Sequence, residues 1–517
     1  MTIDDAEALA RGPSIAARLR EHAAAYPARP YAVEQGRTTT VAEMDALVDQ
    51  IAEALSAAGV DGSARVAISL PTTVLHAAAI FAVLRRGALW VPMNLQLKGA
   101  PLEHLMADSG ASHLIAASES AIVTSVDEVR RSRHGASLDD GRVIPDPTGA
   151  DARIWRIDDG IALDPVPDTS VLMYTSGTTG PPKGVRVSET MLRASAIGTI
   201  HVTDVRPGDV LYVWEPLFHI GGAQMLLVPL YSDSHLALAP RFSASRFWDD
   251  VCRVGATHVH YLGGILQILL QLPESEAERR HGVRVAWGAG ATPALWEACE
   301  QRFGFSLHEC YGMTETSSIV AVNRREREGG IGRPVPWFDV RLDGQAEPPV
   351  GTVAEILVRG RIPGLTTAGY LGNDEATCKA RDGEWFRTGD HGEWDESGRL
   401  HFRGRASDSV RVRGENVSAW QVEDVFGQHP DVDRCAVVGV SADVGEEEML
   451  LLLTAADGRA LDPEAVRAWG IDRMARFQVP RYVKLIDEMP LTPSQRIAKH
   501  RLPTGLDDAI DCAVRVR

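Results

Sequence analysis

Hydroxyl residues, glycines and one lysine are concentrated in the stretch Tyr174-Thr175-Ser176-Gly177-Thr178-Thr179-Gly180-Pro181-Pro182-Lys183-Gly184-Val185. An apolar run at 170–173 precedes it and is typical of a buried strand, and Ser188-Glu189 beyond it is typical of a helix N-terminus. In such a loop glycines let backbone N–H groups approach an anion, hydroxyls donate hydrogen bonds and lysine supplies charge. We therefore predict a phosphate-binding loop. It is not a Walker loop, because Lys183 is followed by Gly184 rather than by Ser or Thr.

Further short motifs follow this loop in order along the chain. Each motif taken alone has an ordinary structural alternative, because His219 could be a core histidine, Tyr311 a packing aromatic and Asp390 a turn residue. The motifs are Pro216-Leu217-Phe218-His219, Gly288-Ala289-Gly290-Ala291, Tyr311-Gly312-Met313-Thr314-Glu315, Phe386-Arg387-Thr388-Gly389-Asp390, Gly404-Arg405 and Val412-Arg413-Gly414-Glu415-Asn416-Val417.

Alternating strand and helix patterns must position these motifs. The capping box Thr40-x-x-Glu43 begins a helical pattern that ends at Gly59, and strand, helix and strand patterns follow at 65–70, 74–84 and 89–92. This alternation returns between 249 and 303 and indicates βαβ units around a mostly parallel sheet. We predict an α/β fold: a large N-terminal domain, 1–404, of α/β/α subdomains plus a β-rich module after about residue 330, a hinge at 405–408, and a small mobile α+β C-terminal lid domain, 409–517.

Composition excludes several classes of protein. The 517 residues carry 53 basic and 70 acidic side chains, a formal net charge of −17, which argues against nucleic-acid binding. The six scattered cysteines form no Cys-x-x-Cys pair, and the acidic N-terminus and interrupted apolar runs argue against a signal peptide or a membrane span. We expect a cytoplasmic, soluble protein, monomeric or homodimeric, without nucleic-acid or membrane partners.

Together and in this order, the motifs resemble those of the adenylate-forming superfamily, which includes acyl- and aryl-CoA ligases, luciferases and peptide-synthetase adenylation domains. The resemblance extends from Tyr174 to Leu502. It implies an acyl-CoA synthetase or ligase with ATP/AMP, coenzyme A and Mg²⁺ as cofactors. A carboxylate first attacks the α-phosphate of ATP, giving an acyl-adenylate and pyrophosphate, and the thiol of CoA then attacks the acyl carbonyl and releases AMP. The first step joins two anions, so it needs positive charge and preorganised N–H donors.

The resemblance also assigns roles to residues. Tyr311 is expected to stack on adenine, Glu315 to help bind Mg²⁺ and Asp390 to hold the ribose hydroxyls, while Gly414 keeps the CoA tunnel open because it has no side chain. Gly221-Gly222 and Gly263-Gly264 are interpreted as leaving room for a bulky acid. The implied residues are His219, Glu315, Arg496 and Lys499 for catalysis; Thr175, Ser176, Gly177, Thr178, Thr179, Gly180, Lys183, Gly288, Ala289, Gly290, Tyr311, Gly312, Met313, Thr314, Asp390 and Arg405 for the nucleotide; Gly414 and Glu415 for the CoA tunnel; and Trp214, Ile220, Gly221, Gln224, Gly263 and Ser317 for the acyl pocket.

The last motif departs from the family pattern. The family reads Pro-x-Thr-x-Ser/Thr-Gly-Lys-Ile, with a lysine that catalyses adenylation, whereas here Gln495 and Arg496 replace the glycine and the lysine. Arginine is a wide planar fork and lysine a compact point charge, so the exchange is not conservative. Either Arg496 or Lys499 supplies the charge and both steps survive, or adenylation is weak or absent and only thioester formation survives; we favour the second. That activity is similar to the non-adenylating acyl-CoA ligases of bacterial diterpenoid antibiotic biosynthesis, and it requires a separate adenylating enzyme as partner.

Other interpretations stay open at this point. Acyl transfer onto a carrier-protein phosphopantetheine would use the same motifs, and a nucleotide-binding protein without catalysis would explain Arg496. Ser407 stands where the family usually has Asp or Lys at the hinge, and we interpret it as a neutral exchange. His258-x-His260 places two imidazoles on one face of a predicted strand, but no third metal ligand is evident, so we interpret both as core histidines.

Overall fold

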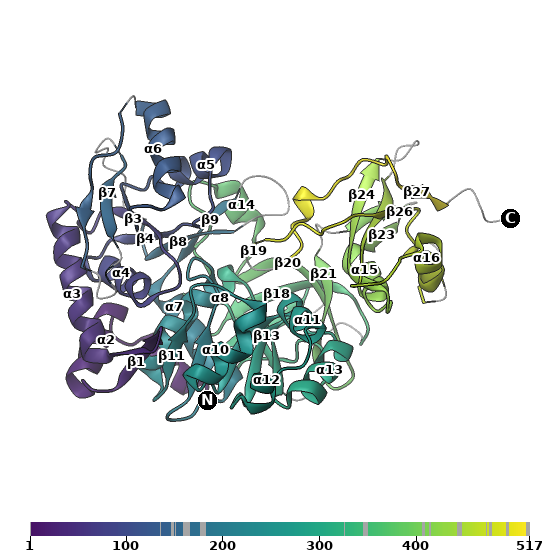
Figure 1. Ribbon diagram of the computed structural model, residues 1–517, viewed down its shortest axis with the longest axis horizontal. Coiled ribbons are helices and arrows are strands. Elements are labelled where there is room, and N and C mark those ends of the chain that lie inside the picture. Colours follow the sequence, from purple (N-terminus) through teal and green to yellow (C-terminus); the bar gives the residue numbers. More distant parts are fainter. Residues whose placement is uncertain are drawn as a thin grey trace. The chain divides into compact units, whose positions relative to one another are not determined.

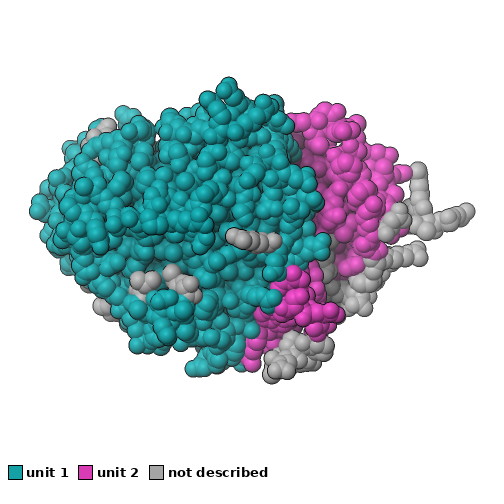
Figure 2. Space-filling view, turned by 90° about the horizontal axis from the view of Figure 1, so that it is seen from below, with its two compact units in different colours: residues 1–340, 358–386 teal, residues 341–357, 387–517 magenta. Residues whose placement is uncertain are grey.

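A computed structural model describes residues 2–134, 136–145, 149, 151–158, 166–175, 182–324, 326–344, 350–405, 409–412, 415–441, 447–471, 473–474, 478–492 and 496–512. The chain divides into two compact units (Figure 2). Unit 1 consists of residues 1–340 and 358–386, and unit 2 of residues 341–357 and 387–517. The division passes through the strands β17 (Phe338–Leu342), β18 (Ala354–Gly360) and β20 (Trp385–Trp394). The domain limits at 404 and 408 stay a prediction, and Ala406, Ser407 and Asp408 lie outside the described residues.

Three of the predicted motifs, 216–219, 288–291 and 311–315, lie at or after strands of a nine-stranded sheet in unit 1. Its central strands are parallel, and its outer pairs at both edges are antiparallel. In spatial order the strands are β16 (Arg333–Pro334), β15 (Ala321–Asn323), β14 (Ser306–Tyr311), β13 (Val285–Ala289), β12 (His258–Leu262), β10 (Val210–Val213), β11 (His235–Leu238), β1 (Pro30–Glu34) and β2 (Arg37–Thr40). Of these strands, β13, β11 and β1 are labelled in Figure 1.

A seven-stranded sheet in unit 1 ends in the hairpin that carries the predicted phosphate loop. Its centre, β5-β3-β4-β8, is parallel, and β8 and β9 pair antiparallel. All five residues of β3 are buried, as expected for a parallel strand covered on both faces. The strands in spatial order are β6 (Arg142–Val143), β7 (Ala152–Arg156), β5 (His113–Ala117), β3 (Arg65–Ser69), β4 (Leu89–Pro92), β8 (Val171–Thr175) and β9 (Lys183–Val187).

Helices connect the parallel strands, and their caps follow from local sequence. The capping box predicted at Thr40 and Glu43 is present at the start of α3, and Thr73 caps α4 by accepting from the His76 N–H. The helices of unit 1 are α1 (Ile3–Ala10), α2 (Ile15–Ala25), α3 (Val41–Ala57), α4 (Val74–Arg85), α5 (Gly99–Ser109), α6 (Ala121–His134), α7 (Glu189–Thr203), α8 (Ile220–Ala223), α9 (Val228–Tyr231), α10 (Phe247–Val254), α11 (Gly263–Gln271), α12 (Glu276–Arg280), α13 (Pro293–Phe303) and α14 (Asp374–Lys379).

Unit 2 has its own hydrophobic core. Val437, Leu451 and Val483 of three neighbouring strands and Phe426 of a covering helix are buried in it. Within the described part of the chain no helix, in either unit, is long and apolar enough to cross a membrane. The elements after β20 are β21 (Leu400–Arg405), the pair β22 (Ser409–Val412) and β23 (Glu415–Ser418), α15 (Ala419–Gly427), β24 (Val432–Ser441), β25 (Glu447–Ala455), α16 (Pro463–Ile471), β26 (Tyr482–Leu485) and β27 (Ile510–Asp511).

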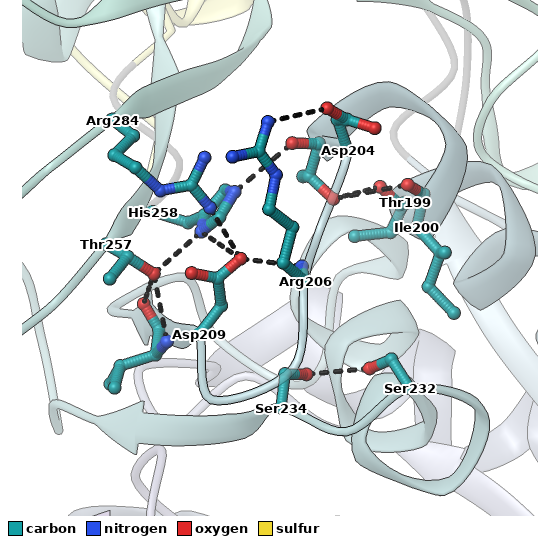
Figure 3. A network of polar contacts seen from close by, with 12 residues as sticks. Thr199, Ile200, Asp204, Arg206, Asp209, Ser232, Ser234, Thr257, His258 and Arg284 are labelled. Carbon is teal, nitrogen blue, oxygen red and sulfur yellow. Dashed lines mark hydrogen bonds and ion pairs between the residues drawn. The ribbon is translucent and has the colours of Figure 1, made fainter.

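A polar network around Asp209 joins α7 to the centre of the nine-stranded sheet (Figure 3). The Asp209 carboxylate accepts hydrogen bonds from Arg284 at 2.6 Å and from the Arg206 N–H at 2.7 Å, and it lies 3.8 Å from Nδ1 of His258. The other ring nitrogen of His258 lies 3.1 Å from the Thr203 carbonyl oxygen. Burial lowers the pKa of His258 to about 4. His258 is therefore a core histidine, and among the described residues no cluster of three His, Cys, Asp or Glu could hold a metal ion.

We expect Asp209→Asn to destabilise the protein. The exchange leaves the partly exposed Arg284 without its carboxylate, and breaking such a pair should cost about 2 kcal/mol, below the range for fully buried pairs. The melting temperature from differential scanning calorimetry should fall by several degrees. Asp204→Asn is the matched control, because Asp204 forms only an exposed ion pair with Arg206. Equal melting temperatures for the two variants would contradict this role of Asp209.

Candidate active site

Four predicted site segments follow parallel strands of the nine-stranded sheet. Trp214 and the residues after it follow β10, Gly263 follows β12, Gly290 follows β13, and Gly312 follows β14. Since carboxyl ends of parallel strands meet at one edge of a sheet, the structure brings these segments to the same edge. Ligands of open α/β sheets bind at this edge. The arrangement therefore supports one site built from all four segments.

A buried carboxylate holds the predicted adenine-flanking loop. Glu309, on β14 and 4% exposed, accepts hydrogen bonds from the N–H groups of Gly290 at 2.5 Å and Ala291 at 3.2 Å. The Tyr261 hydroxyl, on β12, donates to the same carboxylate at 2.5 Å. Glu309 thus ties three neighbouring strands to the loop. The sequence analysis, which predicted no strand at this place, missed Glu309, and the available signal was an acidic residue two positions before Tyr311.

The glycines of the predicted acyl pocket allow close backbone packing. A Cβ at Gly263 would lie 2.2 Å from the Gly290 carbonyl oxygen, and a Cβ at Gly222 would lie 2.3 Å from the Pro216 carbonyl oxygen. A Cβ at Gly221 would lie 2.4 Å from a carboxylate oxygen of Glu215. The interpretation that these glycines leave room for a bulky acid was wrong, because neighbouring atoms already fill that space.

The other predicted pocket residues are mostly buried. Trp214 is 2% exposed and its indole N–H donates to the His260 carbonyl at 2.7 Å. Gln224 is 2% exposed, whereas Ile220 and His219 are half-buried at the start of α8. Ser317 is 1% exposed and donates to the Leu365 carbonyl at 2.6 Å, so its hydroxyl has an internal partner.

Described residues flank the predicted phosphate loop. Thr175 and Lys183 pair across the β8–β9 hairpin, while Ser176, Gly177, Thr178, Thr179 and Gly180 lie outside the described residues. The Lys183 ammonium lies 5.1 Å from the centroid of the Tyr370 ring, within range of a cation–π contact. The Tyr370 hydroxyl donates to the Glu315 carboxylate at 3.1 Å. Tyr370, which the sequence analysis did not single out, therefore lies between the lysine of the phosphate loop and the predicted Mg²⁺ ligand.

The segment after β14 is tightly held. Tyr311 and Thr314 are both 8% exposed, and Met313 precedes a short 3₁₀ helix, η3 (Thr314–Thr316). A Cβ at Gly312 would lie 1.9 Å from the Ser318 carbonyl oxygen, so only glycine fits there. Glu315 is 8% exposed, and its backbone carbonyl accepts from the Thr367 N–H at 2.8 Å. A buried carboxylate held in this way is a suitable ligand for Mg²⁺. In proteins Mg²⁺ usually takes one or two carboxylates and completes its coordination with water and substrate phosphates.

Unit 2 holds the remaining predicted residues. Asp390, 3% exposed, and Arg405 face each other across β20 and β21, with Nε 2.9 Å from the carboxylate. Lys499 forms an ion pair with Glu423 of α15 at 2.8 Å. Arg496 is exposed, and its backbone N–H donates a hydrogen bond to the Thr492 hydroxyl at 3.0 Å. Glu415 begins β23, and Gly414 lies outside the described residues.

Comparison with known proteins finds the same family along most of the chain. The model of the AMP-binding enzyme family matches residues 19–371, and that of the AMP-binding enzyme C-terminal domain matches residues 421–496. Feruloyl-CoA synthase of Amycolatopsis sp. is 32% identical over 508 residues, which cover 95% of this chain and 98% of that protein. Sulfoacetate–CoA ligase of Cupriavidus necator is 30% identical over 505 residues, covering 95% and 97%.

A solved structure shares the fold. The o-succinylbenzoate-CoA synthetase of Bacillus subtilis, in complex with its acyl-adenylate intermediate, matches with a TM-score of 0.78 and 25% identity, covering 96% of this chain and 98% of that one. The chain therefore belongs to the AMP-binding enzyme family. Two predictions are confirmed: the α/β fold with a large N-terminal and a small C-terminal domain, and the enzyme class of acyl-CoA synthetases or ligases.

We expect AMP binding to depend on the ionisation of Glu309. Burial raises the pKa of Glu309 to about 7. Because the ionised carboxylate only accepts hydrogen bonds, protonation removes an acceptor from the Gly290 and Ala291 N–H groups. AMP affinity should therefore fall as the pH drops from about 8 to about 6. Glu309→Gln should bind AMP about tenfold more weakly at the higher pH and show a flatter pH dependence.

Isothermal titration calorimetry with AMP measures both effects. Glu297→Gln, which removes a half-exposed carboxylate of α13, is the matched control and should keep the affinity and pH dependence of the unaltered protein. If Glu309→Gln retained the pH dependence, another group would be the one that titrates.

Proposed function

We propose that the protein is an acyl-CoA ligase that forms a thioester from an acyl-adenylate and CoA, and that its adenylation half-reaction is weak or absent. The observation that carries this proposal is Arg496 at the position of the family's adenylating lysine. A planar guanidinium cannot reproduce the compact ammonium that bridges a substrate carboxylate and the α-phosphate. A separate adenylating enzyme would then supply the acyl-adenylate.

The contacts of Lys499 support this proposal. Its ammonium pairs with Glu423 at 2.8 Å, and the same carboxylate oxygen accepts from the Val437 N–H at 2.7 Å. Glu423 therefore links Lys499 to α15 and β24 within unit 2. Moving Lys499 to a substrate would leave a half-buried carboxylate without its cation, which is unfavourable. Lys499 is thus a poor substitute for the missing lysine.

The proposed step needs binding and orientation more than charge. The CoA sulfur forms a bond with the acyl carbon, the bond from that carbon to the AMP oxygen breaks, and the thiol proton is released to water. In this proposal Glu309 fixes the loop beside adenine, Tyr311 stacks on the base, and Asp390 holds the ribose hydroxyls. None of these roles requires a lysine at position 496.

A complete two-step ligase is the second candidate. The alignment of Lys183, Tyr370 and Glu315 favours it, because these residues suit ATP phosphates and Mg²⁺. Bound Mg²⁺ would neutralise phosphate charge, and Glu315 is the residue that would hold it. In this reading Arg496 supplies enough charge for adenylation.

A paired assay separates the two candidates. Pyrophosphate exchange with ATP and a panel of acids, including the ferulate and sulfoacetate named for the relatives, measures adenylation. Thioester formation from preformed acyl-adenylates and CoA measures the second step. We expect thioester without appreciable exchange. Robust exchange would support the two-step ligase, and the absence of thioester from every adenylate would contradict both candidates.

We expect Arg496→Lys to raise the rate of pyrophosphate exchange at least about tenfold, because it restores a compact point charge. Thioester formation from preformed acyl-adenylate should stay unchanged. Arg501→Lys, in the nearby 3₁₀ helix η6 (Lys499–Arg501), is the matched control and should change neither rate. No gain in exchange for Arg496→Lys would show that Arg496 is not what limits adenylation.

A further inference from the structure

Three buried polar side chains lie among the segments of the predicted acyl pocket. Glu215 is 6% exposed, His260 is 7% exposed and Gln224 is 2% exposed. Glu215 follows Trp214 after β10, His260 lies on β12, and Gln224 begins the 3₁₀ helix η1 (Gln224–Leu227) after α8. They come from the edge of the nine-stranded sheet at which the candidate active site is built. Pockets of this kind contain few polar groups, and those present determine specificity.

The Glu215 carboxylate makes defined contacts on two sides. One oxygen lies 2.9 Å from Nδ1 of His260. Both oxygens lie against the backbone of Gly221, because a Cβ there would be 2.4 and 2.6 Å from them. Glu215 also contributes, after burial and Glu309, to raising the pKa of the Cys310 thiol, which places it within electrostatic range of the residue before Tyr311.

Gln224 adds an acceptor on the same side of the helix. Gly221 and Gln224 are three residues apart, about one turn of helix, so they lie on the same side of this segment, and Gly221 packs against Glu215. The side-chain oxygen of Gln224 is buried and accepts no hydrogen bond from the residues that the structure describes. A buried acceptor without a donor costs free energy unless a ligand supplies the donor.

We infer that Glu215, His260 and Gln224 form a recognition site for the acyl group, and that the acyl group carries a hydrogen-bond donor, a hydroxyl or an ammonium, at the end remote from its carboxyl carbon. The inference rests on the proposed function, because it assigns a substrate class to that acyl site. Carboxylate and amide oxygens accept hydrogen bonds, so a purely apolar chain would leave the Gln224 oxygen unsatisfied and bring hydrocarbon against the buried Glu215 carboxylate. A donor at that end satisfies the acceptors.

Matched ligands test the inference without requiring turnover. The probes are acyl-sulfamoyl adenosines, hydrolysis-resistant mimics of an acyl-adenylate, that differ only in a terminal methyl, hydroxyl or ammonium group on acyl chains of equal length. Calorimetric titration should show that the hydroxyl or the ammonium mimic binds at least about tenfold more tightly than the methyl mimic. AMP alone is titrated in parallel, because it does not reach the acyl site.

Two variants identify the donor. Glu215→Leu should abolish the preference over the methyl mimic, whichever donor is favoured. Glu215→Gln removes the charge but keeps an acceptor, so it should preserve a preference for the hydroxyl and abolish one for the ammonium. AMP affinity should stay unchanged in both variants, which would exclude general damage to the fold, and Glu297→Gln should behave as the unaltered protein.

The outcomes separate this inference from the proposed function. Equal affinities for the three mimics would overturn the inference while leaving thioester formation intact. A donor preference that survives undiminished in Glu215→Leu would also overturn it, because Glu215 would then take no part in binding the donor. If none of the acyl-adenylates yielded a thioester with CoA, that result would contradict the proposed function and the inference with it.

Discussion

The hydrogen bonds to the buried Glu309 carboxylate are the interactions on which the predicted site residues of unit 1 depend. It receives hydrogen bonds from the backbone of the Gly290 loop and from Tyr261, so one side chain sets the spacing of segments after β12, β13 and β14. The carbonyl of Gly290 in turn lies against Gly263. The loop is thus held through its N–H groups on one side and by backbone contact on the other. A shift in any of these segments would change the shape of both the predicted adenine-flanking loop and the predicted acyl pocket.

The residues predicted for adenylation are divided between the two units. Unit 1 contains the lysine, tyrosine and glutamate expected to contact phosphates and Mg²⁺, and these residues are joined by direct contacts. Unit 2 contains the Asp390–Arg405 pair and Arg496, the residue that we propose to stand in place of the adenylating lysine. The change at Arg496 therefore affects a residue of unit 2 and leaves the contacts within unit 1 intact. Loss of adenylation and retention of adenylate binding are compatible for this reason.

Much of the fold and part of the site could be predicted from the sequence. The capping box at Thr40 and the buried run of β3 depend on local patterns, and motif residues at strand ends converge because the strands are parallel. Glu309 and Tyr370 were missed because their partners lie far away along the chain. The role of Gly221 was misread because the sequence does not show which atoms surround a missing side chain.

The packing around the glycines limits how the substrate range of this enzyme could change. Exchanging Gly222 or Gly263 for a larger residue would meet main-chain carbonyl oxygens, which have no rotamers through which to move aside. At Gly221 the obstacle is a side chain, Glu215, that can be altered by a single exchange. In laboratory evolution toward other acids, adaptive exchanges should therefore accumulate at Glu215 and its polar neighbours, while Gly222 and Gly263 remain unchanged.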